Sequence, residues 1–401
     1  MSLLASLVPV GAVAGGVFQL VSLWAALRLL GTRRRANAAG GPRPPVTVLK
    51  PVRGAGDGLY ENLASFCRQD YPAHQIVIGV DDPDDPAVAV VGRLKRDFPQ
   101  LDIVLAVGSL PGANRKIANV LQMMRHARHD VLVLSDADVR VRPDYLAEVV
   151  APLADPQVGL TTCLYRAVGG RGLPALVESL LINTWFIPMA LTACLRPLRA
   201  AFGATMAVKR QALDAIGGFA ALRDHLADDY QLGRRVAEAG YRVELLPYVV
   251  ETFIDSTTLG DVWRHQLRWV RTYRVCQPLG WALSVVTHAT LWGLLGFAVF
   301  AEVPAGWKLL TALVAVRLTT LAVLMLRLGE GRALRGLWLV PATDLMATAL
   351  WAAGFLGRRV EWGGRAYLVR RDGSMLALTP VDVPAPPAPV ELPPPAARRV
   401  S

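Results

Sequence analysis

The feature that most constrains this chain is a set of long apolar blocks, because such blocks must be buried in a protein core or in a lipid bilayer. Residues 1–27 contain no charged side chain, and Arg28, Arg33, Arg34 and Arg35 follow. A hydrocarbon core about 30 Å thick is crossed by roughly 20 apolar helical residues. The block is too long for a cleaved signal peptide and lacks a basic start. We predict a transmembrane anchor over residues 1–30, and the arginines after it place the next segment in the cytoplasm.

Three further apolar blocks lie near the C-terminus, at residues 281–300, 309–326 and 337–356. We predict that residues 281–356 form a bundle of transmembrane helices. The second block contains Arg317 and the third Asp344, and an unpaired charge in lipid is costly. We predict that these two side chains face one another inside the bundle. The alternative is that both reach an interface or face the soluble domain.

The arginines after residue 357 bear on how often the chain crosses the membrane. Three C-terminal crossings would leave them on the outer side, against the preference for positive charge inside. One of the three blocks is therefore expected to be re-entrant.

The composition excludes several other classes of protein. Of the 401 residues, 19% are charged, whereas a soluble domain carries about 25%. The four cysteines include no C-x-x-C pair, which excludes a small disulfide scaffold. Much of the net charge of +11 lies beside apolar blocks and no aromatic–basic recognition motif is present, so nucleic acid is not an expected partner. Residues 380–401 are rich in proline and are predicted to be a disordered tail.

Between the anchor and residue 170, short β-branched runs alternate with helical patterns. Strands are predicted at residues 46–51, 75–80, 102–107 and 131–134, and helices at 59–68, 86–98 and 114–128. This alternation predicts an α/β domain of parallel β-α-β units with helices on both faces of a sheet. Right-handed crossovers bring the carboxyl ends of such strands to one edge, where open α/β sheets bind ligands. We place this domain at residues 44–275.

The second predicted strand ends in a dense acidic run. Four carboxylates stand within five residues, at Asp81, Asp82, Asp84 and Asp85. They repel one another unless a cation or a donor-rich ligand compensates them. Some of them also suit the cap of the helix that begins at Pro86, and both roles can hold together, with Asp85 capping and the others reaching a ligand.

The fourth predicted strand ends in a second acidic motif, Asp136 and Asp138. Positions i and i+2 of an extended segment point to the same side, so both carboxylates can face one ion. Mg²⁺ and Mn²⁺ prefer such hard oxygen ligands and keep water and phosphate in their coordination shell. A D-x-D motif alone often means only a solvated loop, but here it follows an apolar strand.

Two later motifs carry candidate catalytic residues. Asp228 and Asp229 precede a predicted helix at residues 230–239, so they are either caps of that helix or, for Asp229, a general base that deprotonates an acceptor hydroxyl. Arg268 and Trp269 precede the membrane blocks. Arginine binds phosphate and tryptophan can support a sugar, whereas the alternative is a basic pair at the membrane surface with an interfacial tryptophan.

A fifth apolar block, residues 179–195, contains Pro188 in its middle. It separates Asp136 from Asp229, and a full membrane crossing here would put these two acids on opposite sides of the bilayer. We therefore predict an interfacial or re-entrant helix at the membrane surface.

Together, these motifs resemble those of membrane-bound inverting glycosyltransferases with a GT-A fold, in particular the ceramide glucosyltransferase-like family with its bacterial hopanoid-glycosylating relatives. The resemblance covers residues 1–370. By position, Asp85, Asp136 and Asp229 match the family's three aspartate motifs. Residues 203–205 and 362–367 resemble its acceptor-side stretch and its C-terminal end.

Further residues correspond to family positions, and one of them differs from the family in residue type. Arg268 and Trp269 match the end of the family's (Q/R)-x-x-R-W signature, whose first position is His265 here. Lys116 falls where the family has a lysine near the nucleotide. A histidine can also donate to phosphate, so His265 is retained as a site residue.

The resemblance implies a GT-A (Rossmann-like) catalytic domain with an N-terminal transmembrane helix and a C-terminal transmembrane bundle. It implies a protein of the bacterial-type inner membrane with its catalytic domain in the cytoplasm. The implied reaction is inverting transfer of a hexose, glucose or N-acetylglucosamine, from a UDP-sugar to a hydroxyl of a membrane lipid of the ceramide or hopanoid type.

The implied site residues fall into three groups. The nucleotide sugar is assigned to Asp82, Asp85, Lys116 and Asp136. A divalent cation, Mn²⁺ or Mg²⁺, is assigned to Asp136 and Asp138. Catalysis is assigned to Asp229, His265, Arg268 and Trp269.

Two alternatives remain. A processive polysaccharide synthase of the cellulose or hyaluronan type shares the motifs, but four spans make a narrow bundle and the signature lacks its leading glutamine. A transporter or non-catalytic scaffold leaves the placement of Asp85, Asp136 and Asp229 unexplained.

Overall fold

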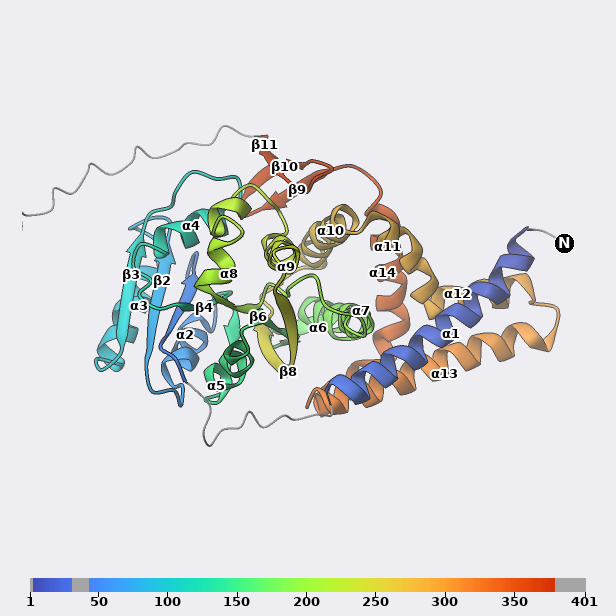
Figure 1. The fold of residues 1–401 in the computed structure, drawn as a ribbon. Coiled ribbons are helices and arrows are strands. Elements are labelled where there is room, and N and C mark those ends of the chain that lie inside the picture. The colour runs from blue at the N-terminus through green and yellow to red at the C-terminus, as the bar shows by residue number, and fades with distance from the viewer. Residues whose placement is uncertain (1–2, 31–42, 379–401) are drawn as a thin grey trace, which may run out of the picture.

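An eight-stranded sheet forms the centre of the α/β part of the protein, and apolar helices from both ends of the chain pack together at one side of it (Figure 1). The computed structural model describes residues 3–30 and 43–378. The predicted cytoplasmic arginines at 33–35 and the proline-rich tail at 380–401 lie outside the described residues.

The four strands predicted from the sequence form the parallel half of the sheet. They are β1 (Val46–Pro51), β2 (His74–Val80), β3 (Asp102–Val107) and β4 (Val131–Ser135), in the spatial order β3-β2-β1-β4. The predicted helices between them are α2 (Leu59–Cys67), α3 (Ala87–Asp97) and α4 (Arg115–Met123). The α/β prediction is therefore confirmed, although α4 ends five residues before the predicted boundary at 128.

The other half of the sheet is mixed rather than parallel. Its strands are β5 (Val139–Arg140), β6 (Val158–Val168), β7 (Thr205–Lys209) and β8 (Arg242–Phe253). β7 is antiparallel to both β4 and β6, β8 is parallel to β6, and β5 closes the far edge against β8. The helices of this half are α5 (Tyr145–Val150), α8 (Arg210–Asp214) and α9 (Asp228–Glu238).

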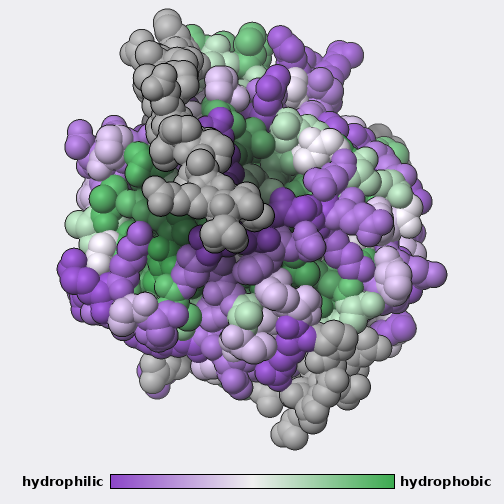
Figure 2. Space-filling view, turned by 60° about the vertical axis from the view of Figure 1, so that its left-hand side comes forward, coloured by the Kyte–Doolittle hydropathy of each residue, from purple (hydrophilic) through white to green (hydrophobic). Residues whose placement is uncertain are grey.

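The surface of the α/β part differs from that of the helical part. Figure 2 shows the face of the α/β part as largely hydrophilic, with smaller areas of exposed hydrophobic side chains. Large apolar side chains lie exposed on the helices near both ends of the chain, for example Val10, Leu279 and Trp338. Such surface is unfavourable in water, and it is expected where helices contact lipid or a partner.

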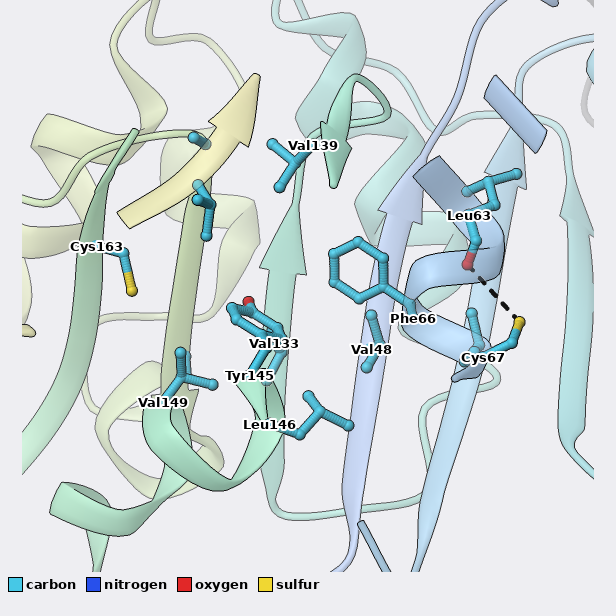
Figure 3. Packing of buried hydrophobic residues seen from close by; sticks show 14 of the residues in the cluster. Val48, Leu63, Phe66, Cys67, Val133, Val139, Tyr145, Leu146, Val149 and Cys163 are labelled. Carbon is cyan, nitrogen blue, oxygen red and sulfur yellow. Dashed lines mark hydrogen bonds between the residues drawn. The ribbon is translucent and has the colours of Figure 1, made fainter. Parts of the chain in front are cut away.

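The core beneath the sheet holds the strand ends in place. Phe66 of α2 and Tyr145 of α5 are fully buried against Val48 and Val133 of the sheet (Figure 3), and their rings meet edge to face at 5.5 Å. Each such side chain stabilises the fold by about 1.5–3 kcal/mol relative to an exposed one.

The apolar block predicted at 179–195 is one interrupted helix that begins earlier than expected. It comprises α6 (Gly172–Leu180), a π-helical stretch (Leu181–Phe186) and α7 (Ile187–Ala193). Pro188 cannot donate a helical backbone hydrogen bond, and the wider π turn directly precedes it. Because the helix connects β6 to β7, which pair in one sheet, both of its ends lie at the α/β part.

Several of the described helices are long and apolar enough to cross a membrane. They include α1 (Leu3–Leu29), the 172–193 helix, α13 (Pro304–Arg327) and α14 (Val340–Ala353) with the 3₁₀ turn Gly331–Leu339 before it. A further pair, residues 278–287 with α12 (Ala289–Val299), is bent by 56° and begins with α11 (Pro278–Leu283). In Figure 1, α1, α12 and α13 run together away from the sheet, whereas α14 runs across them beside α10 (Leu259–Cys276).

The predicted pairing of charges inside the bundle is confirmed. The guanidinium of Arg317 on α13 lies 2.7 Å from the carboxylate of Asp344 on α14, and both side chains are buried. The same carboxylate accepts a hydrogen bond of 2.5 Å from Thr290 on α12, and Arg317 also donates to Gln19 on α1. This network joins four apolar helices and compensates both charges.

A small antiparallel sheet follows the last helix, and it contains the motif at residues 362–367. Its strands are β9 (Arg359–Trp362), β10 (Arg365–Val369) and β11 (Met375–Ala377). It is bound to the α/β part, because Leu226 N donates to Gly373 O at 3.0 Å and Met375 N donates to Asp224 O at 2.7 Å. The chain after α14 thus returns to the α/β part.

Candidate active site

One cavity of about 1350 Å³ lies at the carboxyl ends of β1, β2 and β4. Charged side chains line one part of it, among them Asp81, Lys116, Asp136, Asp138 and Asp229. Apolar side chains from α7 and α11 line another part, among them Met189, Ala190 and Trp281. The cavity therefore connects the acidic edge of the sheet with the apolar helices.

Lys116 is the cation at the centre of the acidic group. It stands in the first turn of α4, where Asn114 caps the helix by accepting a hydrogen bond of 3.0 Å from Ile117 N. Its ammonium lies 2.7 Å from Asp136 and 3.2 Å from Asp228. Burial alone would lower the pKa of Lys116, but the carboxylates of Asp136 and Asp228 raise it above the usual range. Lys116 therefore stays charged and holds the second and third aspartate motifs together.

Asp229 lies in the first turn of α9 and lines the cavity. Burial, and then the neighbouring charge of Asp228, raise the pKa of Asp229 to about 6. A carboxyl group with a pKa near the working pH suits a general base. Asp229 is thus both accessible and tuned for proton transfer.

Two glycines allow the backbone to approach Asp229 closely. A Cβ on Gly203 would lie 3.0 Å from Asp229 Oδ2, so a larger residue would press on the carboxylate. On α9 itself, a Cβ on Gly233 would lie 2.3 Å from the backbone of Ala200. These contacts fix α9 against the loop that carries residues 200–203.

Asp136 and Asp138 follow β4 and both line the cavity, as predicted. Burial, and then the charge of Asp136, raise the pKa of Asp138 to about 7. Asp138 makes no ion pair with any described residue. The two carboxylates repel one another, and a divalent cation bound by their hard oxygen atoms would relieve this repulsion.

The ligand set is small. Among the described residues, no group of three or more His, Cys, Asp or Glu side chains is arranged to hold a metal ion. Two carboxylates fit an ion that takes the rest of its shell from water and a diphosphate, as Mg²⁺ commonly does.

Lys50 lies directly behind this pair and is not among the predicted site residues. It is fully buried in β1, contacts the backbone oxygen of Asp136 and lies 4.0 Å from the centre of the Phe66 ring. Burial lowers the pKa of Lys50 to about 7, although the carboxylates of Asp138 and Asp136 oppose this shift. The buried lysine therefore positions the turn that carries both carboxylates. Its one sequence signal is a charged residue in an otherwise apolar strand.

The acidic run after β2 divides between the two roles predicted for it, although the residue that lines the cavity is not one of those assigned to the nucleotide sugar. Asp81, rather than Asp82 or Asp85, lines the cavity, and it accepts a hydrogen bond of 2.8 Å from Arg115. Asp82 is exposed outside the cavity wall. Asp85 accepts hydrogen bonds of 2.9 Å from Gly54 N and 2.8 Å from Ala87 N. Its carboxylate thus caps α3 and holds the loop after β1, so its geometry is that of a structural residue at the rim.

The signature residues on α10 face the cavity from the other side. His265, Arg268 and Trp269 all line it, and the guanidinium carbon of Arg268 lies 5.8 Å from the centre of the Trp362 ring. Burial lowers the pKa of Arg268, and the nearby Tyr273 and Asp136 oppose this effect. The C-terminal sheet therefore supplies one wall of the site.

A cluster of aromatic side chains also lines the cavity. Phe186 of the π-helical stretch stacks on Tyr165 of β6 at 4.9 Å and on Tyr273 of α10 at 6.2 Å. Trp269 meets Tyr165 and Phe186 edge to face, each at 6.1 Å. Aromatic faces of this kind suit a sugar ring or the first carbons of a lipid chain.

Two curated relatives share part of this chain. Ceramide glucosyltransferase 3 of Caenorhabditis elegans is 26% identical over 230 residues, which are 57% of this chain and 50% of that protein. Beta-monoglucosyldiacylglycerol synthase of Synechocystis sp. is 26% identical over 270 residues, which are 61% of this chain and 53% of that protein. The chain spans about half the length of these relatives.

A solved structure shares the fold. The mannosyltransferase PcManGT from Pyrobaculum calidifontis, in complex with GDP-Man and Mn²⁺, aligns with a TM-score of 0.53 and 20% identity. The alignment covers 88% of this chain and 99% of that one. The predicted GT-A fold is thereby confirmed. The model of glycosyl transferase family 21 matches residues 7–375. Since this match covers nearly the whole chain and agrees with the predicted resemblance, the protein belongs to glycosyltransferase family 21.

Proposed function

We propose that this glycosyltransferase transfers a hexose, glucose or N-acetylglucosamine, from a UDP-sugar to a hydroxyl group of a membrane lipid, with inversion at the anomeric carbon. The observation that carries this proposal is the single cavity that joins Asp136 and Asp229 to the apolar wall of α7 and α11. A polar donor and a lipid acceptor need such a two-sided site. The named activities of the two curated relatives, which concern ceramide and a glucosyldiacylglycerol, support the same class of acceptor.

The nucleoside of the donor binds beside β2. Asp81 Oδ1 and Asn119 Oδ1 are buried and accept no hydrogen bond within the described part of the chain, and both residues line the cavity. A buried acceptor without a partner is costly, and an N–H group of a nucleobase or a ribose hydroxyl would satisfy it. We assign this contact to Asp81, in place of Asp82 and Asp85.

Asp229 acts as the general base. Its carboxylate removes the proton from the acceptor hydroxyl, and the oxygen attacks the anomeric carbon from the side opposite the departing diphosphate. One displacement of this kind inverts the anomeric centre. Phe186, Trp269 and Tyr273 lie between the base and the apolar helices, where they hold the sugar and the head of the lipid.

Positive charge stabilises the diphosphate as it leaves. Lys116 and Arg268 line the same part of the cavity, and Arg268 suits charge-assisted hydrogen bonds to phosphate. A divalent cation held by Asp136 and Asp138 would supply further charge there.

Removal of divalent cations is expected to stop transfer. Treatment with EDTA should abolish turnover, and added Mn²⁺ or Mg²⁺ should restore it, because Asp136 and Asp138 would otherwise repel the diphosphate. The measurement is sugar transfer in detergent, with EDTA already saturated with Mg²⁺ as the control. Full turnover after exhaustive chelation would remove the metal role from both residues.

The proposed location is a bacterial-type inner membrane, with the α/β part and the C-terminal sheet on the cytoplasmic side. Three crossings, by α1, by the bent pair that ends in α12 and by α13, satisfy this arrangement. The contacts of the C-terminal sheet with Asp224 and Leu226 support it, because a third C-terminal crossing by α14 would separate them. The 172–193 helix and α14 then lie along the inner surface of the membrane.

Cysteine labelling tests this arrangement. Glu302→Cys, in the loop between α12 and α13, should react with an impermeant maleimide in intact cells, whereas Arg371→Cys should react only after permeabilisation. The protein without either change corrects for its own cysteines. Labelling of both variants in intact cells would contradict the three crossings.

The proposed reaction is tested with purified membranes, labelled UDP-sugars and lipid extracts, followed by mass analysis of the product. One sugar on a lipid supports the proposal. A ladder of polymer would instead support a polysaccharide synthase, and the absence of any transfer would contradict both.

A further inference from the structure

Glu178 is a buried carboxylate for which the proposed reaction has no use so far. It stands on α6, its side chain is 1% exposed, and it lies in the cavity wall. A charged side chain this deeply buried is costly unless it is paired and hydrogen-bonded. Among the described residues its one ion-pair partner is His265, the first position of the signature on α10.

Three donors hold the carboxylate, two of them on α10 and one just before it. Ser256 Oγ donates to Oε2, and Nδ1 of His265 contacts Oε1. Gln266 Nε2 donates to Oε1 at 3.5 Å. Glu178 is thus fixed from both of its oxygens and in turn fixes the ring of His265.

This contact decides which nitrogen of His265 faces the site. A carboxylate only accepts hydrogen bonds, so Nδ1 carries the hydrogen and Nε2 is left for other partners. Nε2 has no hydrogen-bond partner in the described part of the chain, the side chain is 35% exposed, and the residue lines the cavity. The ring centre lies 4.9 Å from that of Trp269, which limits its rotation.

We propose that Glu178 is the positioning residue for His265: it holds the imidazole so that Nε2 faces the sugar diphosphate, and so lets a histidine fill the place of the signature's first residue. This proposal rests on the proposed function, since it needs a diphosphate in the cavity. The hydrogen-bonded pair of Glu178 and His265 also links α6, which lies beside the apolar helices, to the signature helix α10.

A double-mutant cycle tests the proposal. Glu178→Gln and His265→Ala are each expected to lower kcat by about ten- to a hundredfold, with the KM for the UDP-sugar changed by less than about threefold. The double variant should be no slower than His265→Ala, because Glu178 has nothing left to position. Glu178→Asp, which keeps the charge but shortens the side chain, should recover part of the loss.

Matched measurements separate this role from a merely structural one. Ser256→Ala removes a hydrogen bond to Glu178 but leaves the contact with His265, and it should keep kcat within about threefold of wild type. Melting temperatures in detergent are compared for all variants. A further loss of activity from Glu178→Gln in the His265→Ala background, equal to its loss in the wild type, would overturn the proposal. Absence of transfer by the wild-type protein would instead overturn the proposed function.

Discussion

Asp229→Asn is expected to lower kcat for sugar transfer by about two to four orders of magnitude, the usual loss on removal of a general base. Asparagine keeps the size of the side chain and its fit against Gly203, but it cannot take a proton from the acceptor hydroxyl. Binding of the UDP-sugar should be nearly unchanged, because the role proposed for Asp229 is toward the acceptor hydroxyl. Transfer to lipid and donor binding by calorimetry measure the two effects separately.

A surface aspartate serves as the control for Asp229. Asp214→Asn makes the same chemical change at an exposed position on α8 and should keep wild-type turnover. If Asp229→Asn kept more than about a tenth of wild-type turnover, another residue would have to be the base.

The raised pKa of Asp229 also predicts how activity depends on pH if this residue is the general base. A base works only when it is unprotonated, so activity should be lost as the pH falls through the pKa of about 6 and should level off above it. The profile of kcat/KM reports the free enzyme, to which this pKa belongs. A flat profile between pH 5 and 7 would contradict the role of Asp229.

Local patterns in the sequence were sufficient to predict the parallel half of the sheet. β3 occupies the predicted residues 102–107, and β1 the predicted residues 46–51, because apolar strands bounded by turns are signalled within a few residues. The antiparallel half was not foreseen. The position of β7 between β4 and β6 depends on pairings across more than 40 residues, which no local pattern contains.

The candidate site likewise contains residues that local patterns predict and others whose position depends on contacts far along the chain. Asp136, Asp138, Asp229 and Arg268 were predicted from their positions beside predicted elements, and the structure brings all four to one cavity. Within the run after β2, sequence could not tell which carboxylate turns inward, because that choice is made when Asp85 binds Gly54, 31 residues away.

Two buried charged residues were missed for a related reason. Lys50 lies in a strand, and Glu178 precedes a predicted apolar helix, so each was read as part of an ordinary element. Their partners are Asp136 and His265, 86 and 87 residues away along the chain. A lone charged residue in an apolar run is a usable signal, but only the fold identifies what compensates it.

Lys116→Met is expected to lower kcat/KM for the UDP-sugar by about 10²–10³, the effect of losing one preorganised charge from a catalytic site. The change keeps the length of the side chain but leaves Asp136 and Asp228 without the ammonium that lies 2.7 and 3.2 Å from them. Removing one partner of a buried ion pair also destabilises a fold by about 3–5 kcal/mol, so the melting temperature should fall.

Lys116→Arg distinguishes lost charge from lost structure. Arginine keeps the positive charge, so this variant should melt close to the wild type while it recovers part of the activity. Lys95→Met, at an exposed position on α3, should change neither quantity. If Lys116→Met instead bound UDP as tightly as the wild type and kept its turnover, the ammonium would serve only to hold the two aspartates together. The positive charge that stabilises the departing diphosphate would then have to come from Arg268 and from a divalent cation, if Asp136 and Asp138 hold one.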